Sequence, residues 1–88
     1  MLSADQIRKL IVVRLYVLDG CKDRQYLYTH IGVIRGLMWC LNGRDPGDIS
    51  KQHLILDAIQ VPYTRDEEGR VWIDEQWLQD HKIDPNRW

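Results

Sequence analysis

The side chains that could carry chemistry are scattered along the chain. Its three histidines are His30, His53 and His81, and its two cysteines are Cys21 and Cys40. Metal sites in proteins use short, regular ligand spacings, and these residues show none. The sequence therefore predicts no metal site and no cofactor. It also predicts two buried, reduced thiols in place of a disulfide.

Motifs for nucleotide binding and for hydrolysis do not occur in the sequence. It contains no Walker-type loop and no GxGxxG, HExxH or GxSxG pattern. The acidic run Asp66-Glu67-Glu68 is too short for a calcium loop, which needs a longer ordered set of oxygen donors. We therefore expect no catalytic residues and no enzymatic activity.

Length and composition indicate one small folded domain, residues 1–88. The 88 residues are 44% hydrophobic and 28% charged, which is typical of a globular chain. No apolar run approaches the roughly 18 residues that a membrane-spanning helix requires. The opening MLSADQIRK lacks the layout of a signal peptide. We expect a cytoplasmic protein with no membrane partner.

The formal net charge of −1 is unevenly distributed. Residues 1–35 carry six basic and three acidic side chains, whereas residues 65–88 carry four basic and seven acidic ones. Proteins that bind phosphate backbones present a concentrated basic face. The sequence shows no such concentration, so its charge pattern does not favour a nucleic-acid partner.

A first helix is predicted to start at Ser3. Ser3 and Gln6 have the spacing of a capping box, and Leu2 and Ile7 can form the hydrophobic staple around it. Residues 10–18 are rich in β-branched side chains and apolar nearly all round, so both a helix and a strand fit them. As a helix, this segment must be covered by the rest of the fold or by a second copy of the chain. A homodimer is therefore a further expectation.

A second helix is predicted between Asp23 as N-cap and Asn42-Gly43 as its end. Two glycines, Gly32 and Gly36, lie one turn apart within it, and we favour their packing against the first helix over a partner's helix. Trp39 is predicted to fill the core. The apolar stripe of this helix consists of Leu27, Ile31, Ile34, Met38 and Leu41.

A third helix is predicted from a cap at Asp48 or Ser50 to about Gln60, where Pro62 forces Val61 out of helical geometry. A short final helix, residues 75–82, follows a cap at Asp74. Its Trp77 is predicted to fill the core. The apolar face of the third helix consists of Leu54, Ile55, Ala58 and Ile59.

A β-hairpin is predicted between these two helices. Val61 and Tyr63 alternate toward one face of the first strand, as Val71 and Ile73 do in the second. A three-residue loop, residues 67–69, with a left-handed glycine would put all four on one side, and a four-residue loop would flip one strand. In either case Trp72 and Arg70 lie on the face opposite Val71 and Ile73. There Trp72 is covered by Ile83 or Trp88 of the C-terminal tail, lies idle, or anchors a partner.

The predicted fold class is α+β: a small, mostly helical domain of three helices, a β-hairpin wing and a short C-terminal helix. Residues 54–78 resemble the wing region of small excisionase-like winged-helix proteins of phages and other mobile elements. The resemblance is carried by Val61-Pro62-Tyr63, the Gly69 turn, Val71-Trp72-Ile73 and Trp77-Leu78. It implies a winged-helix-like fold, in which the helix before the wing enters the major groove and the wing follows the phosphates.

Two functions follow from these observations. The first is a small regulator or inhibitor of phage or mobile-element type that binds a host protein, because all eight aromatic residues are Trp or Tyr, which are enriched at interfaces. Its candidate binding residues are Arg70, Trp72, Glu67 and Glu68.

The alternative function is a winged-helix DNA-binding transcriptional regulator or an excisionase-like protein. Its candidate residues are Lys51, Gln52, Arg65 and Arg70. We favour protein binding because three consecutive carboxylates, residues 66–68, stand at the predicted wing tip and would be repelled by phosphates.

Overall fold

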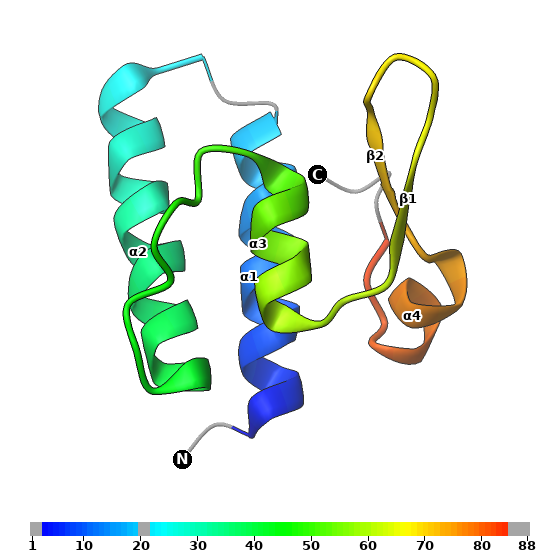
Figure 1. Ribbon diagram of the computed structural model, residues 1–88, viewed down its shortest axis with the longest axis horizontal. Helices are drawn as coiled ribbons and strands as arrows, with labels where there is room; N and C mark the ends of the chain where they lie inside the picture. Colours follow the sequence, from blue (N-terminus) through cyan, green and yellow to red (C-terminus); the bar gives the residue numbers. More distant parts are fainter. Residues whose placement is uncertain (1–2, 20–21, 85–88) are drawn as a thin grey trace.

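The computed structural model describes residues 3–19 and 22–84. Two long helices, α1 (Ala4–Asp19) and α2 (Arg24–Asn42), form an antiparallel pair. A short helix α3 (Gln52–Ile59) follows, then a hairpin of β1 (Tyr63–Arg65) and β2 (Val71–Ile73), and then α4 (Glu75–Asp80). Figure 1 shows the hairpin and α4 on the side of α3 and α1 away from α2. The predicted α+β class and element order are confirmed, whereas the winged-helix likeness stays a prediction.

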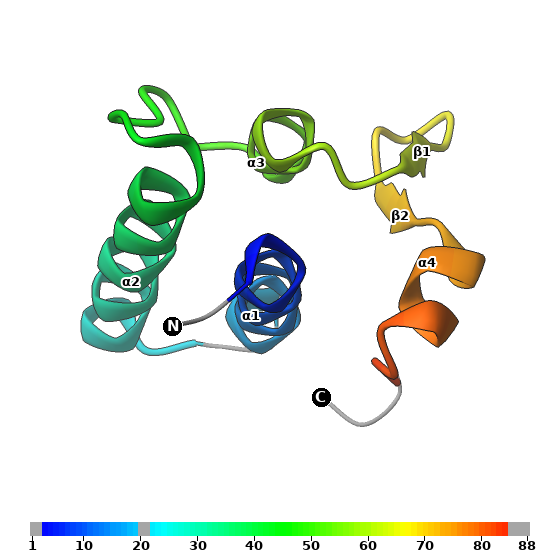
Figure 2. The ribbon, with the colours of Figure 1, turned by 90° about the horizontal axis from the view of Figure 1, so that it is seen from below.

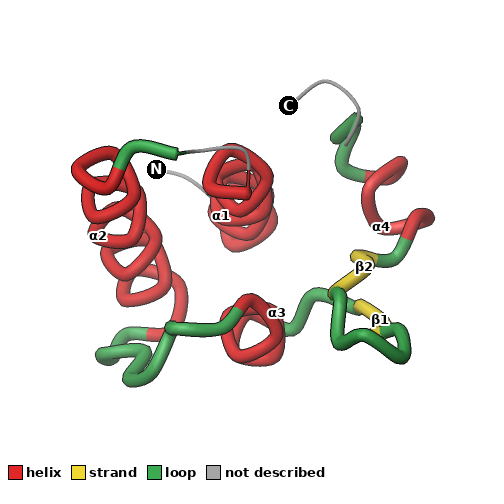
Figure 3. The backbone as a smooth tube through the Cα atoms, turned by 90° about the horizontal axis from the view of Figure 1, so that it is seen from above, coloured by secondary structure: helices red, strands yellow, loops and turns green. Residues whose placement is uncertain are grey.

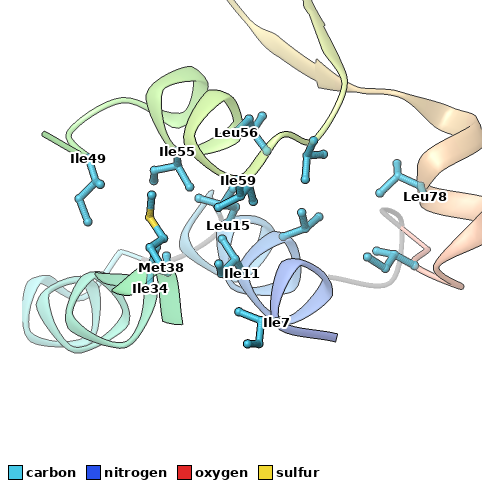
Figure 4. Close-up of a cluster of buried hydrophobic side chains, with 13 residues drawn as sticks. Ile7, Ile11, Leu15, Ile34, Met38, Ile49, Ile55, Leu56, Ile59 and Leu78 are labelled. Atoms are coloured by element: carbon cyan, nitrogen blue, oxygen red, sulfur yellow. The ribbon is translucent and has the colours of Figure 1, made fainter. Parts of the chain in front are cut away.

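Helix α1 lies in the middle of the fold. Seen along its axis, α2, α3, the hairpin and α4 form an arc around it (Figures 2 and 3). The buried hydrophobic side chains form one cluster between these elements (Figure 4). Its members from α1 are Ile7, Ile11, Val12 and Leu15, and its largest fully buried members elsewhere are Ile34, Met38, Leu56 and Ile59.

Residues 10–18 are helical, which decides between the two structures that the sequence allowed. The helix begins at the predicted capping box: the Ser3 Oγ accepts from the Gln6 N–H at 3.2 Å, and the Gln6 Oε1 accepts from the Ser3 N–H at 2.8 Å. Ile11 and Val12 have no exposed surface. Burial by the surrounding elements outweighs the weak helix preference of β-branched residues. The predicted staple includes Leu2, which lies outside the described residues.

Helix α2 begins and ends where the sequence predicts. The Asp23 carboxylate accepts from the Gln25 N–H at 2.9 Å, and Gly43, with φ of 72°, donates its N–H to the Trp39 carbonyl at 2.7 Å. Ile34 and Met38 are fully buried. The ends were predictable because caps depend on local sequence.

The predicted orientation of α2 is partly wrong. Ile31 is 37% exposed and Trp39 is 53% exposed, while His30 takes a place in the core with 7% exposure. His30 lies four positions before Ile34 and Ile31 lies three positions before it, so with about 100° of turn per residue they flank Ile34 on either side. A small rotation of the helix therefore buries one of them and exposes the other. Cys40 is exposed, so its predicted burial is wrong as well. Cys21 lies outside the described residues.

The two glycines of α2 do not pack against α1. A Cβ atom added at Gly32 or Gly36 would meet no other atom within 4 Å, and both residues are exposed. The predicted internal packing is therefore wrong. Both glycines lie on the outer surface of the helix, and the homodimer stays a prediction.

Helices α3 and α4 end in the same way. Gln60 and Lys82 are left-handed, with φ of 61° and 57°, and the next residue donates its N–H to the carbonyl five positions back. The pairs are Val61 to Leu56 at 3.1 Å and Ile83 to Leu78 at 2.9 Å. These are Schellman motifs. Their termini are Ile59 and Asp80, so the predicted final helix to residue 82 is two residues too long.

The predicted cap of the third helix is wrong. Helix α3 begins at Gln52 after Lys51, which provides no side-chain cap. The Asp48 carboxylate instead accepts from the Ser50 N–H at 2.9 Å and so closes a turn before the helix. The expected apolar face is present, because Ile55 and Ile59 are buried. Leu56 is also fully buried, although the sequence pattern did not select it.

The hairpin has a three-residue loop, which decides between the two loop lengths that the sequence allowed. Tyr63 pairs with Ile73, Thr64 with Trp72 and Arg65 with Val71, and Gly69 has φ of 83°. Tyr63, Val71 and Ile73 pack against the core on the same side as the buried Val61. The Tyr63 hydroxyl donates to the Asp57 carboxylate at 2.8 Å, which ties the hairpin to α3. This bond raises the pKa of Tyr63.

Replacing Gly32 or Gly36 by alanine should stabilise the chain. Alanine is favoured over glycine in a helix by roughly 0.5–1 kcal/mol, and the new Cβ meets open space. Urea unfolding should therefore show a higher free energy of unfolding for each variant. Gly43→Ala is the matched control, and it should destabilise because Gly43 is left-handed.

A loss of stability in Gly32→Ala or Gly36→Ala would contradict this expectation. It would show that another helix approaches the glycines closely. Sedimentation of the wild type at several concentrations would then show whether that helix belongs to a second copy.

Candidate functional site

The main cleft of the structure lies between the hairpin and the ends of two helices. It has a volume of about 1200 Å³ and is bounded by the C-terminal end of α1, the start of α3 and strand β2. Of the predicted site residues, it is lined by Lys51, Gln52, Arg65, Glu68, Arg70 and Trp72. Glu67 does not line it. The residues predicted for protein binding and those predicted for DNA binding thus share one cleft.

Sequence analysis missed the part of the cleft that comes from α1 and α4. Tyr16 and Asp19 line it from α1, and Glu75 lines it from the start of α4. Burial raises the pKa of Tyr16. No local motif marks these residues, because they reach the cleft only through the packing of α1 and α4 in the folded chain.

Asp66 holds the hairpin loop together. Its Oδ1 accepts from the backbone N–H groups of Glu68 and Arg70, both at 2.9 Å, and its Oδ2 accepts from the Trp72 indole Nε1–H at 3.2 Å. These bonds lower the pKa of Asp66, with the Arg70 N–H the largest cause and the Trp72 indole the next. The carboxylate predicted as part of an acidic tip is therefore also a structural acceptor.

Trp72 is exposed although its indole is bonded. Its side chain is 56% exposed, on the hairpin face opposite Val71 and Ile73, as alternation predicts. Ile83, which the sequence offered as a cover for it, belongs to the core with 6% exposure. Trp88, the other offered cover, lies outside the described residues. The result is an accessible aromatic ring whose N–H is anchored at the loop.

Charges of both signs line the cleft. The Arg70 guanidinium lies 3.7 Å from the Glu68 carboxylate, an exposed pair that adds little stability. Within residues 3–19 and 22–84, neither Lys51 nor Arg65 forms an ion pair. Two cations of the cleft are thus available to a ligand.

The histidines lie apart. His53 lines the cleft, His30 is buried with its Nδ1 at 3.0 Å from an Arg14 guanidinium nitrogen, and His81 stacks on Trp77 at 4.0 Å between ring centres. Trp77 itself packs against the core, as predicted. In the described part of the chain, no three His, Cys, Asp or Glu side chains are placed to hold a metal ion.

Comparison with protein-family models found no matching model, and comparison with curated proteins and with solved structures found no significant match. The resemblance to excisionase-like proteins therefore stays a prediction. Among the described residues, no helix is long and apolar enough to cross a membrane.

The bond between Asp66 and Trp72 should be visible in a pH titration. Because the folded-state pKa of Asp66 is lowered, its stabilising contribution is complete above the usual carboxyl pKa of about 4 and is lost as the pH falls through the lower value. The indole N–H resonance of Trp72 in a ¹H–¹⁵N spectrum should therefore titrate with a midpoint below about 4.

Asp66→Asn supplies the matched control for this titration. The amide keeps an oxygen for the loop N–H groups but offers nitrogen, a donor, where Oδ2 accepts from the indole. The Trp72 resonance should shift at pH 7 and lose its acid titration, while that of Trp39 stays unchanged. An identical titration in both proteins would contradict the bond.

Proposed function

We propose that the chain is a non-enzymatic regulator or inhibitor that binds a host protein through the cleft beside its hairpin. The observation that carries this proposal is Trp72, a large aromatic side chain that is 56% exposed and yet anchored through its indole N–H. An exposed ring whose orientation is already restricted loses less conformational entropy when a partner covers it. The phage-type origin and cytoplasmic location expected from the sequence are parts of this proposal.

The neighbours of Trp72 suit a protein partner. Arg70 lies beside it, and Trp and Arg are the residues that most often dominate interface energies. Glu67 and Glu68 add carboxylates at the hairpin loop. A rim of mixed charge around an aromatic anchor is typical of protein interfaces, where polar residues surround a desolvated centre.

DNA binding is the second candidate, and one observation favours it. Lys51, Gln52, Arg65 and Arg70 come from separate segments, yet all four line the same cleft. Against it, Asp19, Glu68 and Glu75 line that cleft too, and phosphates would be repelled by them. We therefore keep protein binding as the preferred function.

Substitution of Trp72 tests the preferred function. Immobilised wild type and Trp72→Ala are incubated with nuclease-treated lysate of the host cell, and retained proteins are quantified by mass spectrometry. Retention of the partner should fall at least about tenfold in Trp72→Ala, because anchor residues contribute about 2 kcal/mol or more. Its thermal midpoint should stay nearly unchanged, since the ring is outside the core.

Trp39→Ala is the matched control, because Trp39 is exposed to a similar extent but lies on α2. It should retain the partner as the wild type does. Equal retention by Trp72→Ala and the wild type would overturn the proposal. A large drop in the thermal midpoint of Trp72→Ala would show that the ring is structural instead.

Duplex binding at about 150 mM salt tests the second candidate, because non-specific affinities there are only about 10⁻⁴–10⁻⁶ M. We expect fluorescence anisotropy to show no sequence-selective binding below about 1 µM. If such binding occurs, Arg65→Ala and Arg70→Ala should weaken it and reduce its salt dependence. That result would reverse the preference between the two functions.

A further inference from the structure

The outer edge of β2 carries backbone groups that no other described residue pairs with. Asp66 donates its N–H to the Arg70 carbonyl, and Asp74 donates its N–H to the Pro62 carbonyl, both at 3.0 Å. In an antiparallel ladder, hydrogen-bonded pairs alternate with pairs whose backbone groups point outward. Thr64 and Trp72 therefore face one another, whereas the N–H and C=O groups of Val71 and Ile73 point away from β1.

These outward groups have no partner elsewhere in the described chain. The sheet contains two strands only, and no bond joins the backbone of Val71 or Ile73 to any other described segment. The residues from Gly69 to Ile73 all line the cleft, so this edge runs along it. An uncovered strand edge is a template for pairing with another chain.

We propose that the cleft receives an extended segment of a partner protein, which adds to β2 as a third strand. This inference rests on the proposed function and specifies the partner's chemistry. Backbone bonds to Val71 and Ile73 would give affinity, and pockets for alternate side chains would give specificity, as in other strand additions. Trp72 borders the same segment on the outer face of the hairpin.

The cleft walls define the side chains that such a segment needs. Val71 and Ile73 direct their side chains to the inner face, where Tyr16 and Leu78 also line the cleft. Alternate apolar residues of the segment fit this face. A carboxylate on the segment would pair with Lys51 or Arg65, which have no ion-pair partner among the described residues.

The size of the cleft favours an extended segment over a small molecule, and the outward backbone groups of β2 favour it over a helix. The cleft volume of about 1200 Å³ exceeds the roughly 300–1,000 Å³ of ligand pockets. A helix would leave the backbone groups of Val71 and Ile73 unpaired.

A library of random dodecapeptides displayed on phage provides a defined probe. It is selected against the full chain, and the recovered peptides are synthesised and measured by calorimetry. We expect alternating β-branched or aromatic residues with at least one Asp or Glu. Failure to recover any binding peptide, or recovery of helix-forming peptides alone, would overturn the strand addition.

Val71→Pro removes the outward N–H while leaving the bonds to β1 in place, and Val71→Ala keeps the N–H as a matched control. Proline should weaken peptide binding at least tenfold relative to alanine. Equal binding by the two variants would overturn the proposal. Far-ultraviolet circular dichroism and a ¹H–¹⁵N spectrum show whether the proline variant is folded.

Hydrogen exchange of the wild-type chain tests the strand addition even if the proline variant does not fold. In the free chain, the amides of Val71 and Ile73 should exchange faster than that of Trp72. Bound peptide should slow those two amides at least tenfold more than it slows Trp72. Slower exchange confined to other segments would overturn the proposal. The same protection of Val71 and Ile73 at high protein concentration without peptide would also overturn it, because it would show a second copy of the chain at this edge.

The lysate experiment distinguishes failure of the strand addition from failure of the proposed protein binding. Loss of the lysate partner in Trp72→Ala but not in Val71→Pro would support protein binding and reject strand addition. Retention of the partner by both variants would reject both ideas.

Discussion

The burial of α1 is the constraint on which the rest of the structure depends. Residues 10–18 of this helix are apolar except for Arg14, and the side chains of Ile11 and Val12 are fully buried. Each fully buried side chain such as Ile11 contributes roughly 1.5–3 kcal/mol relative to an exposed one, so leaving α1 open would be costly. Figure 2 shows how α1 is covered: α2, α3, the hairpin and α4 form an arc around it. The cleft follows from the same arrangement, because Tyr16 and Asp19 at the end of α1 form one of its walls.

Polar contacts complete the attachment of α3 to both long helices. The Arg8 Nε–H donates to the Ile59 carbonyl at 2.8 Å, and the Asn42 amide donates to the Ala58 carbonyl at 3.3 Å. These carbonyls lie in the last turn of α3, where they have no partner within the helix. The left-handed Gln60 then turns the chain toward the hairpin. The position of the hairpin is thus set by the end of α3, and Tyr63 reinforces it through Asp57.

The parts of the fold that sequence predicted are those that depend on neighbouring residues. The caps at Ser3, Asp23 and Asp74 and the left-handed Gly69 each use a bond or dihedral within a few positions. The rotation of α2 about its axis does not depend on neighbouring residues in this way. Ile31 and His30 are adjacent in sequence, and packing against α1 determines which of them is buried. The helix ends at Gln60 and Lys82 do have a sequence pattern from which they could have been predicted.

This pattern is the same spacing of two apolar residues at both helix ends. In both, a buried Leu is followed five positions later by a buried Val or Ile, with a polar residue directly before it. This apolar contact accompanies Schellman ends. Glycine usually occupies the left-handed position, so a search for glycine alone could not find these two ends.

The part of the candidate site that comes from the hairpin and the start of α3 was predictable from sequence, but its union with α1 and α4 in one surface was not. Arg65, Arg70 and Trp72 belong to the hairpin, yet Lys51 joins them only because α3 starts beside β2. The role of Asp66 was also hidden, since its sequence neighbours suggest a solvated acidic run and its three hydrogen bonds show a loop acceptor. Glu68 contributes its backbone N–H to this loop and its carboxylate to the pair with Arg70.

The balance of charge in the cleft bears on what it can bind. Lys51, Arg65 and Arg70 supply three positive charges to its walls, and Asp19, Glu68 and Glu75 supply three negative ones. A phosphate backbone carries one sign throughout, so attraction by the first set is opposed by the second. A polypeptide segment can place both signs, apolar side chains and backbone hydrogen-bonding groups in a single strand. The mixed charge of the cleft therefore supports the proposed polypeptide partner over a nucleic acid.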